Sequence, residues 1–238
     1  RQMCIRDRDF MAGSMDVHTL VITSTVPEES KSNVAVNLAM TMAESGKKVA
    51  LVDCDLRKPV LHRYLKAGHN VKGVSNVLSN QCTLDEALQE LKEMNLTFLP
   101  AGTPPPNPSE MLSQPQMQAM VNTLREKFDV VIFDAPPVSV VTDAAVIGRY
   151  VDGAVFVVRS DYAPADAVRG AVKKLQDAGV RVLGSVLTRY DMKKALKGSS
   201  YAYSYAYNYN YAYENQKANA AESVSYTHLR AHETEADL

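Results

Sequence analysis

Six apolar runs of strand length are spaced along the chain, and this pattern constrains the fold more than any other feature. They span His18 to Ser24, Lys48 to Asp53, Leu96 to Leu99, Val130 to Asp134, Ala154 to Arg159 and Val182 to Thr188. The runs are continuous rather than alternating, which is typical of strands buried on both faces of a sheet. Helical patterns lie between most of them, at Asn33 to Glu44, Gln114 to Lys127 and Ala163 to Ala178. We therefore predict an α/β fold with a mainly parallel central sheet flanked by helices.

The composition of the chain fits one large domain with tails. Hydrophobic residues make up 46% and charged residues 22% of the 238 positions, which is enough for one full core. The net charge of −1 gives no sign of a nucleic-acid partner. We assign residues 16–198 to the domain and residues 199–223 to a tyrosine-rich flexible tail. Residues 1–15 and 224–238 contain MCIRDR and SYTHLRAHE, which resemble translated sequencing adapters, so we interpret both ends as artefacts, or the first as a disordered lead.

The cysteines and the apolar runs predict where the protein resides. Cys4, Cys54 and Cys82 have neither metal-ligand nor CxxC spacing, which favours a reducing cytoplasm. No apolar run approaches the ~18 residues that a bilayer-spanning helix needs. We therefore expect a cytoplasmic protein that reaches the inner face of the membrane through a partner.

The first apolar run is followed by the loop TSTVPEESKSN, with Lys31 and Ser32 opening a helical pattern. This is the layout of a phosphate-binding loop, in which backbone N–H groups hold phosphate oxygens, the Lys reaches the outer phosphates and the hydroxyl binds Mg²⁺. Such loops have glycine where this chain has Glu28 and Ser30, and a left-handed non-glycine residue costs roughly 1–2 kcal/mol. Binding also requires Glu28 and Glu29 to point into solvent, because a carboxylate facing a triphosphate would add about 1–4 kcal/mol of repulsion. Taken alone, the loop is equally compatible with a helix N-cap that has no ligand.

Two further apolar runs end in carboxylates. The second continues as VDCDLRKP, with Asp53 and Asp55 two residues apart, and the fourth closes as VVIFDAPP on Asp134. Carboxylates at a buried strand end are costly without a cation, although an ordinary Asp-rich turn is the alternative for Asp53 and Asp55 alone. One such carboxylate can approach a metal while another accepts a proton, and an apolar run that ends in Asp is typical of a Walker B strand. Jointly, the three strand ends predict a Mg²⁺-nucleotide site in a P-loop NTPase-like fold.

The tail carries a tyrosine at every odd position from 201 to 213, with only Ala, Ser or Asn between them. The run has no Leu, Ile or Val to anchor a strand, so we interpret it as a solvated segment. Tyrosines on a flexible tether are good phosphate acceptors, and each phosphorylation adds roughly −1.5 to −2 charges. Prion-like low complexity and an edge strand are the alternatives. The predicted phosphoacceptors are Tyr201, Tyr203, Tyr205, Tyr207, Tyr209, Tyr211 and Tyr213.

Together these features resemble the cytoplasmic catalytic domain of the bacterial tyrosine kinases (BY-kinases) of capsule and exopolysaccharide synthesis. The resemblance rests on the loop that ends in Lys31 and Ser32, on LVDCDLRKP, on AGTPPPNPSEML from Ala101 to Leu112, on FDAPP followed by Thr142-Asp143-Ala144, and on the tyrosine cluster. It extends from about His18 to Tyr213. The PPPNPSEML stretch is especially specific, because by periodicity alone it is only a proline-rich loop before a helix.

The resemblance implies an ATP-dependent protein-tyrosine kinase that phosphorylates its own tyrosine cluster in trans and regulates capsule or exopolysaccharide synthesis. The implied cofactors are ATP and Mg²⁺. The residues implied at the nucleotide are Thr25, Ser30, Lys31, Ser32 and Asn33. Those implied at the metal are Ser32, Asp55 and Asp134. The implied catalytic residues are Lys31, Asp55 and Asp53, with Asp53 as the base for the tyrosine hydroxyl.

The resemblance also implies partners. These are a membrane-bound polysaccharide co-polymerase that acts as activator, other copies of the chain in a ring-like oligomer, and a counteracting tyrosine phosphatase. The chain resembles the family type in which the activator is a separate subunit.

Two alternative functions remain open from the sequence. The first is a nucleotide-binding regulatory scaffold with an impaired loop, whose tyrosines are phosphorylated by another copy or another kinase. The second is a partition or division-site ATPase, but that group has a signature Lys five positions before the loop Lys, where this chain has Val26. Thr188 stands where the kinase family often has an Asn that faces the base, which leaves the adenine contacts open.

Overall fold

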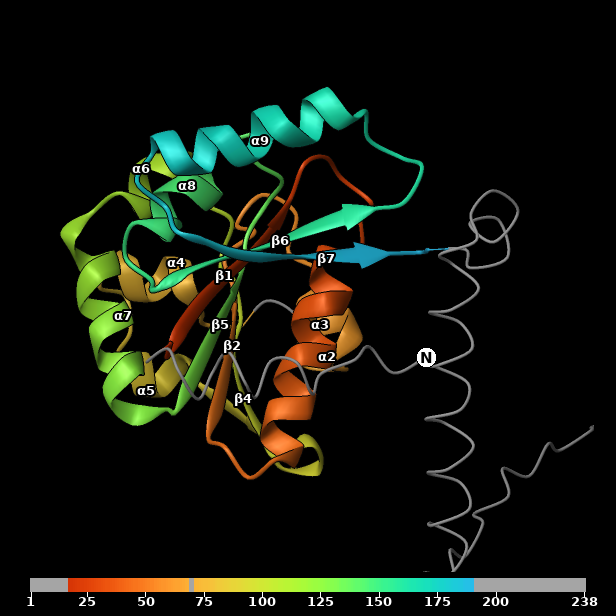
Figure 1. Cartoon of the computed structure of the whole chain (residues 1–238). Coiled ribbons are helices and arrows are strands. Elements are labelled where there is room, and N and C mark those ends of the chain that lie inside the picture. Colours follow the sequence, from red (N-terminus) through yellow and green to blue (C-terminus); the bar gives the residue numbers. More distant parts are fainter. Residues whose placement is uncertain (1–16, 69–70, 191–238) are drawn as a thin grey trace, which may run out of the picture. The chain divides into compact units, whose positions relative to one another are not determined.

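One seven-stranded sheet forms the centre of the computed structural model, which describes residues 17–68 and 71–190 (Figure 1). The strands are β1 (Thr19–Ser24), β2 (Val49–Asp53), β3 (Gln89–Leu91), β4 (Leu96–Leu99), β5 (Val130–Asp134), β6 (Gly153–Arg159) and β7 (Val182–Thr188). Their order across the sheet is β3-β4-β2-β5-β1-β6-β7, and only the β3–β4 pair is antiparallel. The predicted α/β class with a mainly parallel sheet is confirmed.

The central strands are continuous apolar runs because helices cover both of their faces. Every residue of β1, β2 and β5 is buried. Along β5 the pleat alternates, so that Phe133 joins one hydrophobic cluster and Ile132 joins the cluster on the opposite face. Full burial of a side chain of this kind contributes about 1.5–3 kcal/mol. Both faces of the sheet therefore drive folding.

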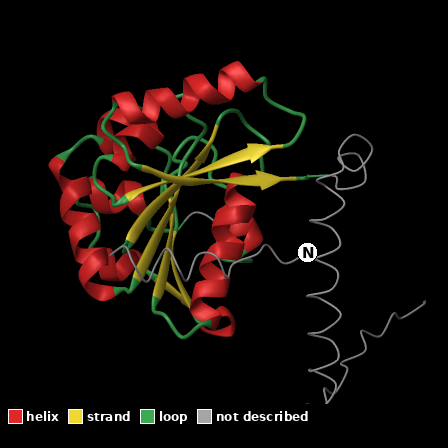
Figure 2. Cartoon of the chain, viewed as in Figure 1, coloured by secondary structure: helices red, strands yellow, loops and turns green. Residues whose placement is uncertain are grey.

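Helices lie on both sides of the sheet (Figure 2). Residues of α2 (Lys31–Glu44) and α3 (Leu61–Tyr64) belong to the cluster on one face. Residues of α4 (Val74–Leu78), α5 (Leu84–Ala87), α6 (Pro108–Leu112), α7 (Pro115–Lys127), α8 (Asp143–Gly148) and α9 (Ala165–Asp177) belong to the cluster on the other. A 3₁₀ turn, η1 (Lys92–Met94), connects β3 to β4. In α7 the buried residues are those with the helical spacing seen in the sequence, Met117, Met120, Val121 and Leu124.

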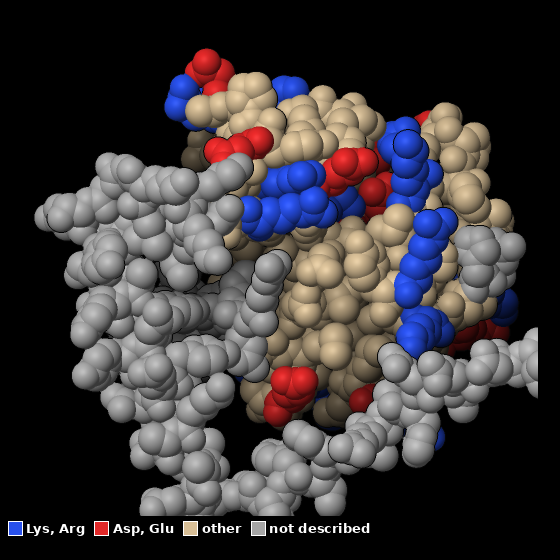
Figure 3. Space-filling model, turned by 90° about the vertical axis from the view of Figure 1, so that its right-hand side faces the viewer, with Lys and Arg blue, Asp and Glu red and all other residues tan. Residues whose placement is uncertain are grey.

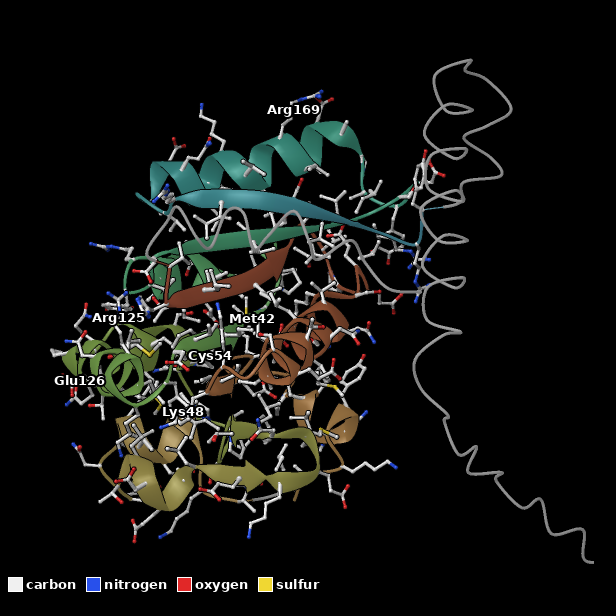
Figure 4. All side chains as sticks on the ribbon, turned by 60° about the horizontal axis from the view of Figure 1, so that its bottom comes forward. Met42, Lys48, Cys54, Arg125, Glu126 and Arg169 are labelled. Atoms are coloured by element: carbon white, nitrogen blue, oxygen red, sulfur yellow. The ribbon has the colours of Figure 1, made fainter. Side chains whose placement is uncertain are left out.

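The ends at which the strands begin are tied together by structural ion pairs. Asp152 accepts hydrogen bonds from the backbone N–H groups of His18 and Thr19, both at 2.8 Å, at the start of β1. The guanidinium of Arg125, at the end of α7, pairs with the same carboxylate and donates to the Thr19 hydroxyl at 2.9 Å. Figure 4 labels Arg125 and Lys48 near this edge, whereas Arg169 projects from the outer side of α9. This edge is occupied by contacts that hold elements together.

The helices of the described ranges are short or polar. None of those within residues 17–68 and 71–190 has both the length and the apolar character that crossing a bilayer requires.

Candidate functional site

The predicted site residues meet where three neighbouring strands end. β5 lies between β2 and β1, and Asp53 is the register partner of Asp134 across β2 and β5. The loop after β1 leads directly into α2, whose first residue is Lys31. Figure 3 views the molecule from the side to which the arrowheads of β6 and β7 point, and Lys and Arg side chains gather there beside several Asp and Glu side chains. Parallel strands therefore bring residues distant in sequence to one edge.

Lys31 connects two of the three predicted carboxylates. Its ammonium nitrogen lies 3.2 Å from Asp55 Oδ2 and 3.3 Å from Asp134 Oδ1. The hydroxyl of Ser32 donates a hydrogen bond of 2.6 Å to Asp134 Oδ2. Burial alone lowers the pKa of Lys31, but Asp134 and Asp55 outweigh it, so the pKa rises above its ordinary value. Lys31 is therefore charged at neutral pH.

Asp134 and Asp53 are buried carboxylates with raised pKa values. Burial raises the pKa of Asp134, against the opposing effects of the Lys31 ammonium and the Ser32 hydroxyl. Burial and the neighbouring Asp134 raise the pKa of Asp53 to about 8, although the N–H of Leu61 works in the opposite direction. The Asp53 carboxylate accepts the N–H groups of Asp55 and Leu61, both at 3.2 Å. These bonds fix its orientation at the end of β2.

The loop between β1 and α2 has left-handed residues at the two positions where phosphate-binding loops have glycine. Glu28 has φ 66° and Ser30 has φ 71°, both in the left-handed region. These are the positions at which the sequence predicted strain, and the structure confirms the conformation at both. The side chain of Ser30 makes no capping hydrogen bond to α2. The first N–H groups of the helix, which have no acceptor within it, thus remain uncapped by Ser30 and suit an anion.

The side chain of Glu29 contradicts the expectation that both glutamates of the loop point into solvent. Glu28 is exposed, but Glu29 is fully buried. Its Oε2 accepts the N–H of Val26 at 2.8 Å, and its Oε1 accepts the N–H of Arg159 at 3.2 Å. Two backbone donors that would otherwise be unpaired compensate the buried charge. The carboxylate therefore supports the loop from within.

The ends of β6 and β7 hold the same loop from the other side. The Thr188 hydroxyl donates to the carbonyl oxygen of Glu29 at 3.0 Å, so in this arrangement it serves the loop. The guanidinium of Arg159 lies 4.2 Å from the centre of the Tyr162 ring and donates to the carbonyl oxygen of Glu28 at 3.4 Å. These contacts fix the strained residues in place.

The remaining predicted nucleotide contacts are Thr25 and Asn33. The buried hydroxyl of Thr25 has no hydrogen-bond partner among the described residues, although buried polar groups rarely remain unpaired. Asn33 is exposed in the first turn of α2, and its side-chain oxygen accepts from Asn37 at 2.8 Å. Asn33 can therefore offer its backbone N–H to a phosphate, whereas its side chain is engaged on the helix surface.

The donor set fits magnesium accompanied by phosphate and water. Within residues 17–68 and 71–190, no group of three or more His, Cys, Asp and Glu side chains is arranged to hold a metal ion alone. The hydroxyl of Ser32 and the carboxylates of Asp55 and Asp134 are oxygen ligands, and Mg²⁺ is typically held by one or two carboxylates while it keeps substrate phosphates and waters. The uncapped N–H groups at the start of α2 and the unpaired Thr25 hydroxyl belong to the same β1–α2 connection and are available as donors to phosphate. The residues present thus fit a Mg²⁺-nucleotide complex.

An ion pair beside the site joins three segments that the sequence singled out separately. Arg57 Nε donates to Asp143 Oδ2 at 3.0 Å, and Arg57 Nη2 donates to the Ser109 hydroxyl at 2.8 Å. Ser109 in turn donates to Asp143, which is fully buried. The LRKP, PNPSE and TDA sequences therefore meet in one network. The sequence showed each segment but not their connection, because 86 positions separate Arg57 from Asp143.

A cavity lies apart from the candidate site. Its volume is about 690 Å³, and its lining includes Lys48, Leu96 and Phe128 at the ends where the strands begin. None of the predicted site residues lines it. The predicted phosphoacceptor tyrosines, Tyr201 to Tyr213, lie outside the described residues.

Comparison with known proteins identifies relatives along most of the chain. A family model described as an AAA domain matches residues 29–163. Tyrosine-protein kinase YwqD of Bacillus subtilis (strain 168) is 35% identical over 193 residues, which cover 81% of this chain and 80% of that protein. The putative tyrosine-protein kinase CapB of Staphylococcus aureus is 35% identical over 192 residues, which cover 81% of this chain and 82% of that protein.

A solved structure agrees with these relatives. The chimerical protein CapA2B2 superposes with a TM-score of 0.74 at 34% sequence identity, and the match covers 78% of this chain and 82% of that one. The resemblance first suggested by the loop, the paired aspartates and the proline-rich stretch is confirmed. The chain belongs to the bacterial tyrosine kinase family.

Proposed function

We propose that this chain is an ATP-dependent protein-tyrosine kinase that phosphorylates the tyrosine cluster of a second copy. Family membership supports the kinase activity. The observation that carries the proposal is the convergence of Ser32, Asp55 and Asp134 on the ammonium of Lys31. Asp53 lies beside Asp134 on the neighbouring strand.

The nucleotide site is built from the loop after β1 and the start of α2. The first N–H groups of α2, including that of Asn33, bind phosphate oxygens, and the ammonium of Lys31 contacts the outer phosphates. Thr25 and Ser30 complete the lining. Ser32, Asp55 and Asp134 hold the Mg²⁺ that accompanies ATP. Held there, magnesium would supply positive charge that stabilises the phosphate oxygens.

Asp53 receives the proton of the acceptor. The tyrosine oxygen forms a bond to the γ-phosphorus while the bond from that phosphorus to the bridging oxygen breaks, and ADP leaves with the bonding electron pair. The hydroxyl proton passes to Asp53 in its ionised form, and the raised pKa of about 8 makes that form a stronger base than an ordinary carboxylate. Asp53 is oriented for this task by the N–H groups of Asp55 and Leu61.

The tail and the partners supply regulation. Each phosphorylation of the cluster Tyr201–Tyr213 adds roughly −1.5 to −2 charges, which favours separation of the copies in a ring-like oligomer. A membrane-bound polysaccharide co-polymerase activates the kinase and brings this cytoplasmic chain to the inner face of the membrane, and a tyrosine phosphatase reverses the reaction. The similarity to the chimerical protein CapA2B2 and to the kinase named CapB supports a role in capsule or exopolysaccharide synthesis with a second subunit.

The test is incubation of the purified full chain with Mg-ATP, with and without the cytoplasmic segment of the co-polymerase. We expect phosphotyrosine at the odd positions from 201 to 213 by mass spectrometry, and its loss in Lys31→Met. Nucleotide binding without any phosphotyrosine would favour the regulatory scaffold instead. The strain at Glu28 and Ser30 is the observation that keeps this second candidate in view.

A further inference from the structure

Arg57 and Asp143 form a two-bonded ion pair that joins the turn after β2 to the loop after β5. Arg57 Nε lies 3.0 Å from Asp143 Oδ2, and Arg57 Nη2 lies 3.3 Å from Asp143 Oδ1. Two N–H···O bonds between planar groups fix their relative angle as well as their distance. The turn follows Asp53 and Asp55, and the loop follows Asp134. This ion pair, the Arg57–Asp143 fork, therefore links the segments that begin at the carboxylates of the site.

We propose that Asp143 is a positioning residue for phosphoryl transfer, which acts through Arg57 to hold Asp53 and Asp55 against the nucleotide. The inference rests on the proposed function and adds a residue outside the nucleotide site to it. Among the described residues, the Asp143 carboxylate is bonded to Arg57 and Ser109 and has no hydrogen bond or ion pair to Lys31. Its influence on the reaction therefore passes through the turn after β2.

The Asp143 end of the fork is held rigidly. Its carboxylate is fully buried, and the residue begins α8. The loop that precedes α8 is bonded to the end of β1, where the N–H of Val138 donates to the Ser24 carbonyl oxygen at 2.9 Å. The N–H of Ser139 donates to the Thr25 carbonyl oxygen at 3.1 Å. Asp143 is therefore fixed relative to the phosphate-binding loop.

The Arg57 end of the fork lies in a turn whose backbone orients both aspartates. The N–H of Asp55 donates to Asp53 Oδ1, and the N–H of Leu61 donates to Asp53 Oδ2, both at 3.2 Å. The N–H of Lys58 donates to Asp55 Oδ1 at 3.0 Å. These three donors lie on either side of Arg57 in the chain. A displacement of Arg57 would therefore move the groups that set the directions of both carboxylates.

Ser109 holds the fork in one orientation. Its hydroxyl accepts Arg57 Nη2 at 2.8 Å and donates to Asp143. Ser109 lies in the first turn of α6, a helix that is anchored by the fully buried side chain of Leu112. Rotation of either charged group out of the fork would break its bond to Ser109 as well. Three segments of the chain thus fix the position of the turn.

The geometry of the fork accounts for its place beside the site better than its stability does. Replacement of a buried ion pair by apolar residues is often neutral or stabilising, because desolvation offsets the attraction between the charges. Phosphoryl transfer, in contrast, depends on position. Catalytic groups need to lie within about 0.5 Å of their productive places, and an error of about 1 Å can lower the rate about 100-fold.

The fork gains importance when a nucleotide binds. In the structure, Lys31 also connects the two segments, because its ammonium pairs with Asp55 and Asp134. A triphosphate that recruits Lys31 weakens those ion pairs. The Arg57–Asp143 fork then remains as a side-chain connection between the segments. We therefore expect its loss to affect the transfer step more than nucleotide binding.

Steady-state kinetics of the purified full chain tests the proposal. Phosphotyrosine formation is followed at varied Mg-ATP in the presence of the co-polymerase segment. Asp143→Asn keeps the size of the side chain but removes its charge and one of its acceptor oxygens. We expect kcat to fall about 10- to 100-fold while the KM for Mg-ATP stays within about threefold of the wild-type value. A raised KM with unchanged kcat would overturn the proposal, and so would wild-type values of both.

A double-mutant cycle tests whether Asp143 acts through Arg57. Arg57→Ala alone should lower kcat about as much as Asp143→Asn, and the double variant should lose no more than either single variant. Arg57→Lys retains the charge but not the two-bonded geometry, so we expect it to recover less than about threefold of the loss. Losses that multiply in the double variant, or full recovery by lysine, would contradict the fork.

Asp152→Asn is the matched control. It breaks the ion pair with Arg125 at the opposite ends of the strands, away from the site. At a temperature at which all variants are folded, we expect its kcat to stay within about twofold of the wild-type value. An equal fall of kcat in Asp152→Asn and Asp143→Asn would reveal a general effect of lost stability and would refute the positioning role.

Hydrogen exchange distinguishes failure of this inference from failure of the proposed function. In Asp143→Asn and Arg57→Ala, the amides of Asp55, Lys58 and Leu61 should exchange about tenfold faster or more than in the wild type, because the turn opens more often. Asp152→Asn should leave them unchanged. Wild-type exchange rates in the first two variants would overturn the fork whether or not the chain is active. If the wild type forms no phosphotyrosine, the proposed kinase function fails and the catalytic role of Asp143 fails with it.

Discussion

Arg57 Nε donates to the buried carboxylate of Asp143 at 3.0 Å, and this ion pair anchors the segment that directly follows Asp53 and Asp55. Asp143 also accepts from Ser109, which lies in the first turn of α6 within the PPPNPSEML sequence. The segment that carries Asp53 and Asp55 is thereby tied to two other family sequences. The structure places the motifs in one network, so each depends on the others for its position.

Loss of Arg57 should therefore destabilise the protein. Arg57→Ala leaves the Asp143 carboxylate buried with only Ser109 as a side-chain partner among the described residues. Because the Arg57 side chain is 37% exposed, we expect a loss of about 1–3 kcal/mol rather than the larger cost of a fully buried pair. Urea unfolding measures this loss, with the neighbouring exposed Lys58→Ala as control. Equal midpoints for the two variants would contradict the role assigned to the pair.

Lys31 should stabilise the folded chain as well as bind phosphate. In Lys31→Met the carboxylates of Asp55 and Asp134 lose their shared cation, and we expect about 3–5 kcal/mol less free energy of unfolding. Adding Asp55→Asn should restore part of this loss, because one of the unpaired charges is removed. Unfolding of both single variants and the double variant gives the coupling energy. Strict additivity of the two substitutions would refute the coupling.

Glycine at position 30 should relieve strain. Ser30 has φ 71°, so Ser30→Gly removes about 1–2 kcal/mol of left-handed strain, offset by about 0.5–1 kcal/mol of added chain entropy. We expect a small net stabilisation in thermal unfolding. Ser45→Gly is the control, since Ser45 has φ −78° and should gain nothing. A destabilised Ser30→Gly would show that the serine side chain has a role that the structure does not reveal.

Glu29 should matter more than Glu28 for the phosphate-binding loop. Glu29→Ala leaves the N–H groups of Val26 and Arg159 without their acceptor, at a cost of about 1–3 kcal/mol, and should weaken Mg-ATP binding. Glu28→Ala removes an exposed side chain at an equally strained position. Nucleotide titration of both variants tests the difference. The prediction fails if Glu28→Ala weakens binding as much as Glu29→Ala.

Asp152 should make stability depend on pH in the acid range. Burial opposes ionisation, but the N–H groups of Thr19 and His18 and the charge of Arg125 prevail, so its folded-state pKa lies below the ordinary 3.8. The stabilisation is therefore fully present above pH 3.8 and is lost as the pH falls through the lowered value. Wild type and Asp152→Asn should differ in unfolding free energy at pH 6 and converge towards pH 3. A constant difference across that range would exclude this linkage.

Most strands were predictable because burial on both faces of the sheet requires a continuous run of apolar residues. The run predicted from Val130 to Asp134 coincides with β5, and the other five runs begin within one residue of their strands. β3 has no continuous apolar run and was not predicted. It has three residues, Gln89–Leu91, pairs in antiparallel fashion at the sheet edge, and is only partly buried. The helices α3 to α6 and α8 have four to six residues each, too few to display a period.

The clustering of Lys31, Asp55 and Asp134 was predictable from the sequence, but the contacts that support the loop beside them were not. Strand ends meet at one edge of a parallel sheet, so Lys31, Asp55 and Asp134 could be expected to lie near one another. The inward turn of Glu29 could not be expected, because it depends on the N–H of Arg159, which is 130 positions away. The pairing of Arg57 with Asp143 could not be expected either, because 86 positions separate the two residues. Long-range hydrogen bonds of this kind leave no local pattern.

The position of Lys31 has a further consequence for the energetics of catalysis. Its ammonium is already neutralised by two carboxylates of its own chain, so a triphosphate that recruits it must compete with them. Under the proposed function, nucleotide capture would be an exchange of ionic partners, and the affinity would be a difference between two opposing electrostatic energies. The same competition favours turnover, because the aspartates draw the lysine back once the spent nucleotide holds it less strongly.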